Sequence, residues 1–229
     1  MVTYTKGATI PHAPTDDTDL YPDTDGKPMA VSDHHRYWLT RILQTLEIHF
    51  ASEPGVYVSG DIMMYYEEGV PQKSVSPDVL VTFGIGQKFR RTYQVWNEGK
   101  VPEFVMEFSS KGTYRNDLGR KRALYAELGM QNYFLCDIEG LYLPTPLMGF
   151  ELVAGEYVAI RPNADGGVMS PVLGLTFQMM DEGLGIYDSV GETWLQTPAE
   201  QEAARAEQAE AEVAQLREQL ARLQSRDSR

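Results

Sequence analysis

The sequence holds a single cysteine, and this excludes two kinds of site at once. Cys136 stands alone among 229 residues. One thiol can form neither an internal disulfide nor a cysteine-rich zinc site. It lies in the apolar run Tyr133-Phe134-Leu135-Cys136-Asp137, so we expect it to pack in the core.

Long hydrophobic runs are missing as well. No stretch approaches the roughly 20 apolar residues of a membrane span. Residues 1–12 have neither a basic start followed by an apolar run nor a small-residue cleavage site. We therefore expect a soluble, cytoplasmic protein with no membrane contact.

Positive charge is scarce, because 33 acidic residues face 20 Lys and Arg, for a net charge of −13. This balance argues against a protein that coats DNA by broad phosphate neutralisation. It leaves room for an enzyme that meets DNA through one basic patch. A metal-dependent nuclease gathers carboxylates around a cation, and the cation then supplies part of the positive charge.

What is present divides the chain into three parts. Residues 1–30 form an acidic lead-in, rich in Pro, Gly and Asp over 15–28, and we expect it to be flexible. Residues 31–192 are expected to form one domain. It opens with an amphipathic helix over 33–50, whose apolar arc includes His35 and His49. We interpret both histidines as core-facing or edge residues, with a ligand role as the alternative.

After this helix the pattern changes to short apolar runs typical of strands, and the runs at 104–108 and 133–136 are almost continuously apolar. A helix over 116–128, ended by Gly129, lies between them, and this order predicts a right-handed crossover. The fold class is therefore α/β, with a mixed central sheet flanked by helices. The remaining strands are expected at 56–58, 62–66, 79–83, 141–143, 149–152 and 156–160.

Two carboxylates stand at predicted strand positions. Asp78 opens the strand 79–83, and Glu107 interrupts an otherwise apolar strand, where an unpaired charge would be expensive to bury. Paired carboxylates suit Mg²⁺, a hard cation that takes oxygen ligands, and Mn²⁺ could substitute for it. The alternative is that Asp78 caps a turn after Pro77 and Glu107 meets a basic side chain.

Lys121 is the third candidate, because a helical wheel places it on the apolar face of the helix that follows Glu107. An inward lysine beside two carboxylates could orient the attacking water or stabilise developing charge on a phosphate. The alternative is an i, i+4 pair with Asp117 at the edge of the core. Glu47 and Asp61 are left out of this predicted site.

Four segments then resemble a known family in order and spacing: Ser76-Pro77-Asp78-Val79, Trp96 to Ser110, Asp117-Leu118-Gly119-Arg120-Lys121 with Tyr125, and Tyr133 to Asp137. They resemble the Uma-type restriction endonucleases, a family abundant in cyanobacteria, over about residues 30–190. The resemblance implies the restriction-endonuclease-like PD-(D/E)XK fold, with Asp78 and Glu107 as the metal-binding acids. Ser109 stands where the superfamily pattern has lysine, and Lys121 matches the lysine expected to replace it.

Two basic clusters flank the proposed acids. One comprises Lys88, Arg90 and Arg91, and the other Lys111, Arg115, Arg120 and Arg122. Both could position a duplex through its phosphates without reading its sequence, and we take Lys111 and Arg115 as candidate substrate contacts. Ordinary solvated charge is the alternative.

The composition changes from Thr197 to Ala, Glu, Gln, Arg and Leu. Apolar residues then recur at steps of three and four, namely Ala206, Ala209, Val213, Leu216, Leu220 and Leu223. Residues 197–229 are therefore expected to form a helix with a short heptad seam, suited to a coiled coil. A homodimer through this tail or through the domain is expected, and a single solvated helix is the alternative.

Two functions compete at this point. The first is a Mg²⁺-dependent endonuclease that hydrolyses phosphodiester bonds in DNA, with Asp78, Glu107 and Lys121 as its catalytic residues. The second is an inactive nuclease-fold module that binds nucleic acid or protein. Ser109 and the acidic composition favour the second function, and the inward position of Lys121 favours the first.

Overall fold

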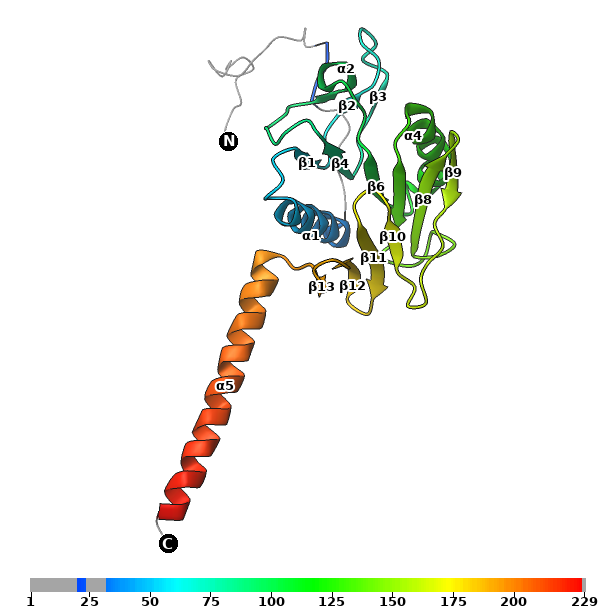
Figure 1. Cartoon of the computed structure of the whole chain (residues 1–229). Helices are drawn as coiled ribbons and strands as arrows, with labels where there is room; N and C mark the ends of the chain where they lie inside the picture. Colours follow the sequence, from blue (N-terminus) through cyan, green and yellow to red (C-terminus); the bar gives the residue numbers. More distant parts are fainter. Residues whose placement is uncertain (1–19, 24–31, 228–229) are drawn as a thin grey trace, which may run out of the picture.

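A mixed six-stranded sheet forms the centre of the molecule (Figure 1). The computed structural model describes residues 20–23 and 32–227, with side chains as far as residue 217. The predicted lead-in therefore lies outside the described residues except for 20–23. The strands are, in spatial order, β1 (Val56–Ser59), β4 (Val79–Phe83), β6 (Phe104–Phe108), β7 (Asn132–Cys136), β8 (Leu147–Val153) and β9 (Glu156–Ala159).

Strands β6 and β7 run parallel, and every other neighbouring pair in this sheet is antiparallel. Both strands are buried along their whole length, which explains why their sequences are apolar except at Glu107 and Asn132. The predicted α/β fold class, with a mixed central sheet and flanking helices, is confirmed.

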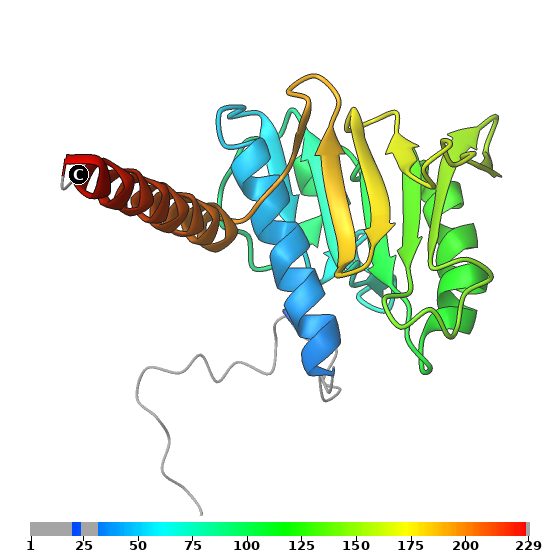
Figure 2. The same ribbon diagram turned by 90° about the horizontal axis from the view of Figure 1, so that it is seen from below.

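One face of the sheet is covered by α1 (Asp33–His49) and by a second sheet (Figure 2). Trp38, Leu39, Ile42 and Leu46 repeat along one side of α1 and are all buried. Phe177 of the second sheet stacks on Phe104 with 5.5 Å between ring centroids. That sheet consists of β10 (Val168–Ser170), β11 (Leu175–Met180), β12 (Gly183–Asp188) and β13 (Thr193–Trp194).

The other face is covered by the helical segment that links β6 to β7. It runs through α3 (Tyr114–Asn116), a π-helical turn η1 (Asp117–Lys121) and α4 (Arg122–Leu128). Gly129 ends it with a φ of 85°, a left-handed conformation in which glycine is not strained. Tyr125 packs into the core on this face, where the side chains of Val105 and Leu135 lie.

Short elements complete the domain at the edge of this face. A three-stranded sheet has the order β3 (Ser74–Val75), β2 (Met64–Tyr65), β5 (Tyr93–Gln94), and α2 (Val95–Glu98) follows it directly. Cys136 is buried in the core, as its position in an apolar run predicted.

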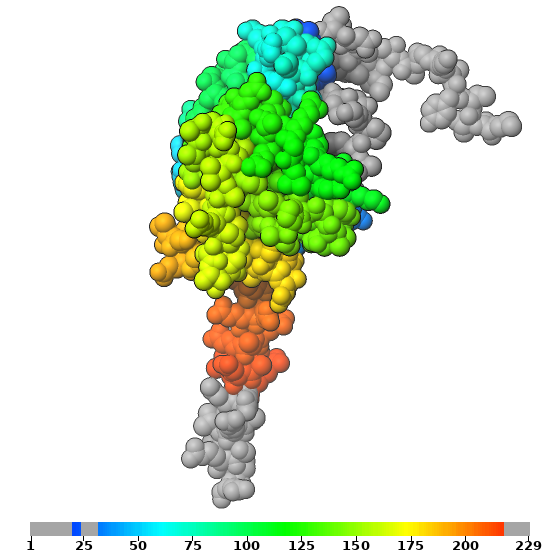
Figure 3. All heavy atoms as spheres, turned by 90° about the vertical axis from the view of Figure 1, so that its right-hand side faces the viewer, coloured from blue at the N-terminus to red at the C-terminus, as the bar shows by residue number. Residues whose placement is uncertain are grey.

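The last helix, α5 (Pro198–Asp227), projects from the domain (Figures 1 and 3). Its start contacts α1, because Arg41 Nε of α1 lies 2.6 Å from Glu200 Oε1. The same arginine also donates to the Leu184 carbonyl of β12 at 3.0 Å. Val213 and Leu216 of the predicted heptad seam are exposed. The predicted C-terminal helix is therefore present, and its pairing as a coiled coil stays a prediction. No helix in the described ranges is long and apolar enough to cross a membrane.

Candidate active site

The pairing of β4 with β6 places Asp78 opposite Glu107. Val79 lies across from Met106 and Leu80 across from Val105, so one further step along the ladder brings Asp78, just before β4, to Glu107. Directly opposed residues on antiparallel strands project to the same face. Both acids therefore face the side of the sheet that carries α3, η1 and α4.

Glu107 is a buried carboxylate, 1% exposed, with both oxygens in polar contacts. Oε1 accepts a hydrogen bond from the Tyr125 hydroxyl at 2.6 Å, and Oε2 lies 2.7 Å from Lys121 Nζ. Two turns of the same helical segment thus fix one side chain. A buried Glu107 was expected to meet a basic side chain. That partner is Lys121, which the sequence had placed in the predicted site.

Lys121 Nζ lies closer to Glu107 Oε2, at 2.7 Å, than to Asp117 Oδ1 on its own helical segment, at 3.8 Å. Burial acts to lower the pKa of Lys121, but the negative charges of Glu107 and Asp78 outweigh this effect and raise the pKa. The ammonium group therefore stays protonated at neutral pH. The alternative pair with Asp117 exists only as the longer of two contacts.

Asp78 occupies the mouth of the site, with 16% of its side chain exposed. Its Oδ2 accepts a hydrogen bond from the Phe108 backbone N–H at 2.6 Å. Burial, followed by the negative charge of Glu107, raises the pKa of Asp78 well above its ordinary value. Two acids that repel each other in this way form a place where a bound cation is favourable.

Asp117 adds a further buried carboxylate that the sequence had offered only as a helix partner of Lys121. The Ser109 hydroxyl donates to its Oδ2 at 2.9 Å, while Oδ1 is buried without a hydrogen bond from any described residue. Burial and then the charge of Glu107 raise the pKa of Asp117 to about 6. Ser109, which stands where the superfamily pattern has lysine, thus uses its hydroxyl to position the Asp117 carboxylate.

Two residues join the site that sequence reasoning left out of it, His35 and Asp61. His35 Nε2 lies 3.9 Å from Asp78 Oδ2, and its ring meets Phe108 edge-on at 5.7 Å between centroids. Burial lowers the pKa of His35, and the charge of Asp61 is the largest effect opposing that. The position of His35 in the apolar arc of its helix was the one available signal, because it required the ring to face the sheet.

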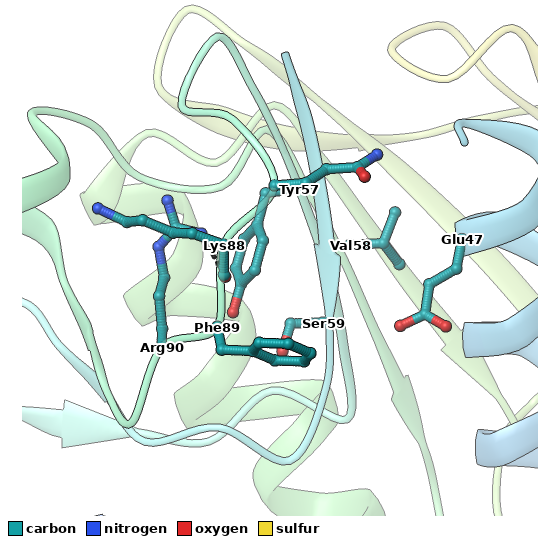
Figure 4. A pocket seen from close by; sticks show the side chains of 8 residues that line it. Glu47, Tyr57, Val58, Ser59, Lys88, Phe89 and Arg90 are labelled. Atoms are coloured by element: carbon teal, nitrogen blue, oxygen red, sulfur yellow. Dashed lines mark hydrogen bonds between the residues drawn. The ribbon is translucent and has the colours of Figure 1, made fainter. Parts of the chain in front are cut away.

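The turn that carries Asp61 is pressed against the first acid. A Cβ on Gly60 would come within 2.0 Å of the Asp78 carbonyl oxygen, so glycine is required there. The Asp61 N–H donates to the Pro77 carbonyl at 3.0 Å, and Asp61 has a φ of 50°, which is uncommon for any residue but glycine. Such conformations cluster at functional sites. Glu47, the other acid left out, lies elsewhere, on α1 and facing Val58 (Figure 4).

The candidate substrate contacts Lys111 and Arg115 lie at the surface, after the end of β6. Lys111 makes no ion pair with any described residue, and the Arg115 guanidinium lies over the Tyr114 ring at 5.3 Å. Arg122, from the same cluster, is instead bonded to the Tyr157 carbonyl at 3.0 Å. Lys111 and Arg115 are therefore placed where phosphates could reach them.

The residues present fit a hard divalent cation held by few protein ligands. No group of three or more His, Cys, Asp or Glu is arranged to hold a metal within residues 20–23 and 32–227. Asp78 and Glu107 supply carboxylate oxygens, and the unbonded Oδ1 of Asp117 is a further buried oxygen. Mg²⁺ is commonly bound through one or two carboxylates and keeps several waters, and Mn²⁺ suits the same oxygen ligands.

Comparison with known proteins adds the family. The solved structure of "a putative nuclease" from Anabaena variabilis matches with 13% sequence identity and a TM-score of 0.47, over 65% of this chain and 80% of that one. No curated protein matches the sequence. The model of the Uma2 family, described as "Putative restriction endonuclease", matches residues 21–181. The predicted resemblance is thereby confirmed, and the chain belongs to the Uma2 family.

Proposed function

We propose that this protein is a metal-dependent endonuclease that hydrolyses phosphodiester bonds in DNA, in the cytoplasm. The observation that carries the proposal is the alignment of Asp78 opposite Glu107 on neighbouring strands, with Lys121 2.7 Å from Glu107. The description of the family as restriction endonucleases supports the choice of reaction.

Each residue of the site has a distinct part in this proposal. Asp78 and Glu107 would hold Mg²⁺ or Mn²⁺, which supplies charge stabilisation to the phosphate when bound. Tyr125 fixes the orientation of Glu107 through its hydroxyl. Lys121 keeps its proton and can therefore donate a hydrogen bond to the attacking water or to the developing negative charge, but cannot accept a proton itself. Lys111 and Arg115 would contact flanking phosphates.

Nicking of supercoiled plasmid in Mg²⁺ or Mn²⁺ tests the proposal. We expect the wild type to nick and Asp78→Asn to fail, because the amide keeps the shape of the side chain but removes its charge. The matched control is Asp165→Asn, an exposed acid in the loop before β10, which should nick as the wild type does. Wild-type nicking by Asp78→Asn that survives re-purification would remove Asp78 from the reaction.

Lys121 is tested in the same assay, with a control for stability. Lys121→Ala should slow cleavage on the order of 10² or more, but it also leaves Glu107 buried without its cation, at a cost on the order of 3 kcal/mol. Lys121→Arg separates the two effects, since it keeps the charge. We expect it to retain the melting temperature and to remain inactive, because the planar guanidinium is larger than the ammonium group. Full activity of Lys121→Arg would show that a positive charge at this position is sufficient and that the ammonium group itself is not required.

A binding module without activity is the second candidate, and Ser109 favours it. The Ser109 hydroxyl is bonded to Asp117 at 2.9 Å, so this position supplies no cation to the site. Binding of DNA by the wild type in the plasmid assay without nicking in either metal would support this second function.

A further inference from the structure

We propose that the loop of residues 84–92, which follows β4, is a binding site for unpaired DNA, with Phe89 stacking on a base and Lys88 contacting a phosphate. The proposal rests on the proposed nuclease function and specifies the strand state of its substrate. Four observations carry it: the rigidity of the loop, the exposure of Phe89, a groove beside it and the charge around it.

Arg90 makes the loop rigid, because all five of its N–H groups are used, two to anchor the loop to Glu98 of α2 and three on carbonyls of the loop itself. Nε and Nη2 donate to the two oxygens of Glu98, each at 2.8 Å. The other N–H groups donate to the backbone carbonyls of Gly86, Lys88 and Ile85. The guanidinium also lies over the Tyr57 ring at 4.0 Å, and its side chain is 3% exposed. Arg90 is therefore a scaffold, and not the phosphate contact that the basic cluster had suggested.

Phe89 is held outward by this scaffold. Its relative exposure is 108%, whereas most large hydrophobic residues in the described part of the chain are buried. A rigid loop pays little further ordering entropy when it binds a partner. A fully exposed aromatic ring on such a loop has the properties of a binding anchor.

A groove of about 550 Å³ lies beside Phe89 (Figure 4). Its walls are Glu47 of α1, the strand β1 from Tyr57 to Ser59, and the loop from Gln87 to Arg90. β1 is the outermost strand of the sheet. Ser59 lies opposite Leu80, two residues from Asp78. A DNA strand leaving the site could follow this edge of the sheet toward Phe89.

The charge around Phe89 fits a nucleic acid better than an apolar partner. Lys88 has 63% of its side chain exposed, and its Nζ lies 3.6 Å from Glu98, whose charge Arg90 already offsets. An exposed aromatic ring beside a cation is the combination that binds single strands, by base stacking and phosphate contact. Bases in a duplex present no free face to such a ring, so we expect the partner to contain unpaired nucleotides.

Binding of a fluorescein-labelled single-stranded oligonucleotide, followed by anisotropy in EDTA, tests the proposal without cleavage. Phe89→Ala should weaken binding on the order of tenfold to a hundredfold. Phe89→Leu should weaken binding equally, because leucine is apolar but cannot stack on a base. Phe89→Trp should keep the wild-type affinity, because tryptophan can stack. The control Val190→Ala alters another exposed apolar residue and should bind as the wild type does. Duplex binding should be unaffected by any of these changes.

Three outcomes would overturn the proposal. The first is that both Phe89→Ala and Phe89→Leu bind single strands with wild-type affinity, and the second is that the wild type binds no single strands. The third is a fall in the mass of Phe89→Ala by light scattering, because this would assign the ring to a protein contact. If single-strand binding depends on Phe89 but the wild type nicks no plasmid, the proposed nuclease function fails and the binding site stands.

Discussion

Asp117 shows at the scale of one residue how the site is maintained at a cost in stability. Its carboxylate is buried with one oxygen unbonded, and burial raises its pKa from 3.8 to about 6. Because the folded state holds this proton more tightly than the unfolded state, the free energy of unfolding falls as the pH rises from about 4 to about 6. The difference between the two pKa values corresponds to about 3 kcal/mol.

Asp117→Asn should remove this pH dependence. We expect the variant to exceed the wild type in unfolding free energy by an amount that grows between pH 4 and pH 7, up to about 3 kcal/mol. Urea denaturation in EDTA at both pH values measures the difference, and Asp165→Asn is the control. Other titrating groups are common to both proteins and cancel in the comparison. Parallel curves for wild type and variant would show that Asp117 is not strained by burial.

Individual residues also show how much of the site the sequence could predict. Asp78, Glu107 and Lys121 interrupt apolar patterns, and a charge in an apolar pattern is visible in one sequence. His35 and Asp61 could not be assigned in this way. Their approach to Asp78 depends on how α1 crosses the sheet and on the contact of Gly60 with the Asp78 carbonyl, both tertiary features.

Among the elements, the strand expected at 141–143 is not formed, and the helical segment after β6 departs from a regular α-helix. The helix expected over 116–128 exists, but Asp117 to Lys121 form a π turn between two α-helical pieces. A helical wheel at a constant angle per residue cannot represent such a turn. It still placed Lys121 inward correctly, and the pair with Asp117 that it offered as the alternative is the longer of the two contacts, at 3.8 Å. π turns are often found at functional sites, and this one carries two residues of the candidate site.

The projecting helix α5 is the element most suited to pair with a second copy. Val213 and Leu216 of its seam are exposed, whereas helices in proteins are stabilised mostly by packing of an apolar face. We expect the full chain to be a dimer by light scattering and a chain ending at residue 205 to be a monomer. This cut keeps Glu200, and therefore its contact with Arg41.

Val213→Glu with Leu216→Glu in the full-length chain is the matched control for this truncation. It places like charges in the seam without shortening the helix, and it should give the monomer as well. The same oligomeric state in all three proteins would exclude pairing through α5. A dimer in all three would place the contact in the domain.

On the scale of the whole molecule, the net charge of −13 opposes the binding of DNA, which is also negatively charged. The positions of the charged side chains resolve this conflict. The acids of the site face one side of the sheet, while Lys88, Lys111 and Arg115 are exposed at the surface. DNA would thus meet a few local cations and a bound metal ion, and not a broadly basic face. We expect binding to be correspondingly weak in EDTA.

The central claim is that Asp78 and Glu107 act together as one cation site for DNA cleavage. The plasmid cleavage rate as a function of Mn²⁺ concentration tests it most directly, in the wild type, Asp78→Asn, Glu107→Gln and the double variant. The account predicts a rate that saturates with Mn²⁺ in the wild type and falls to the same residual level in all three variants, because residues acting as a unit are not additive. A wild-type rate in either single variant, or equal wild-type cleavage in EDTA, would contradict it.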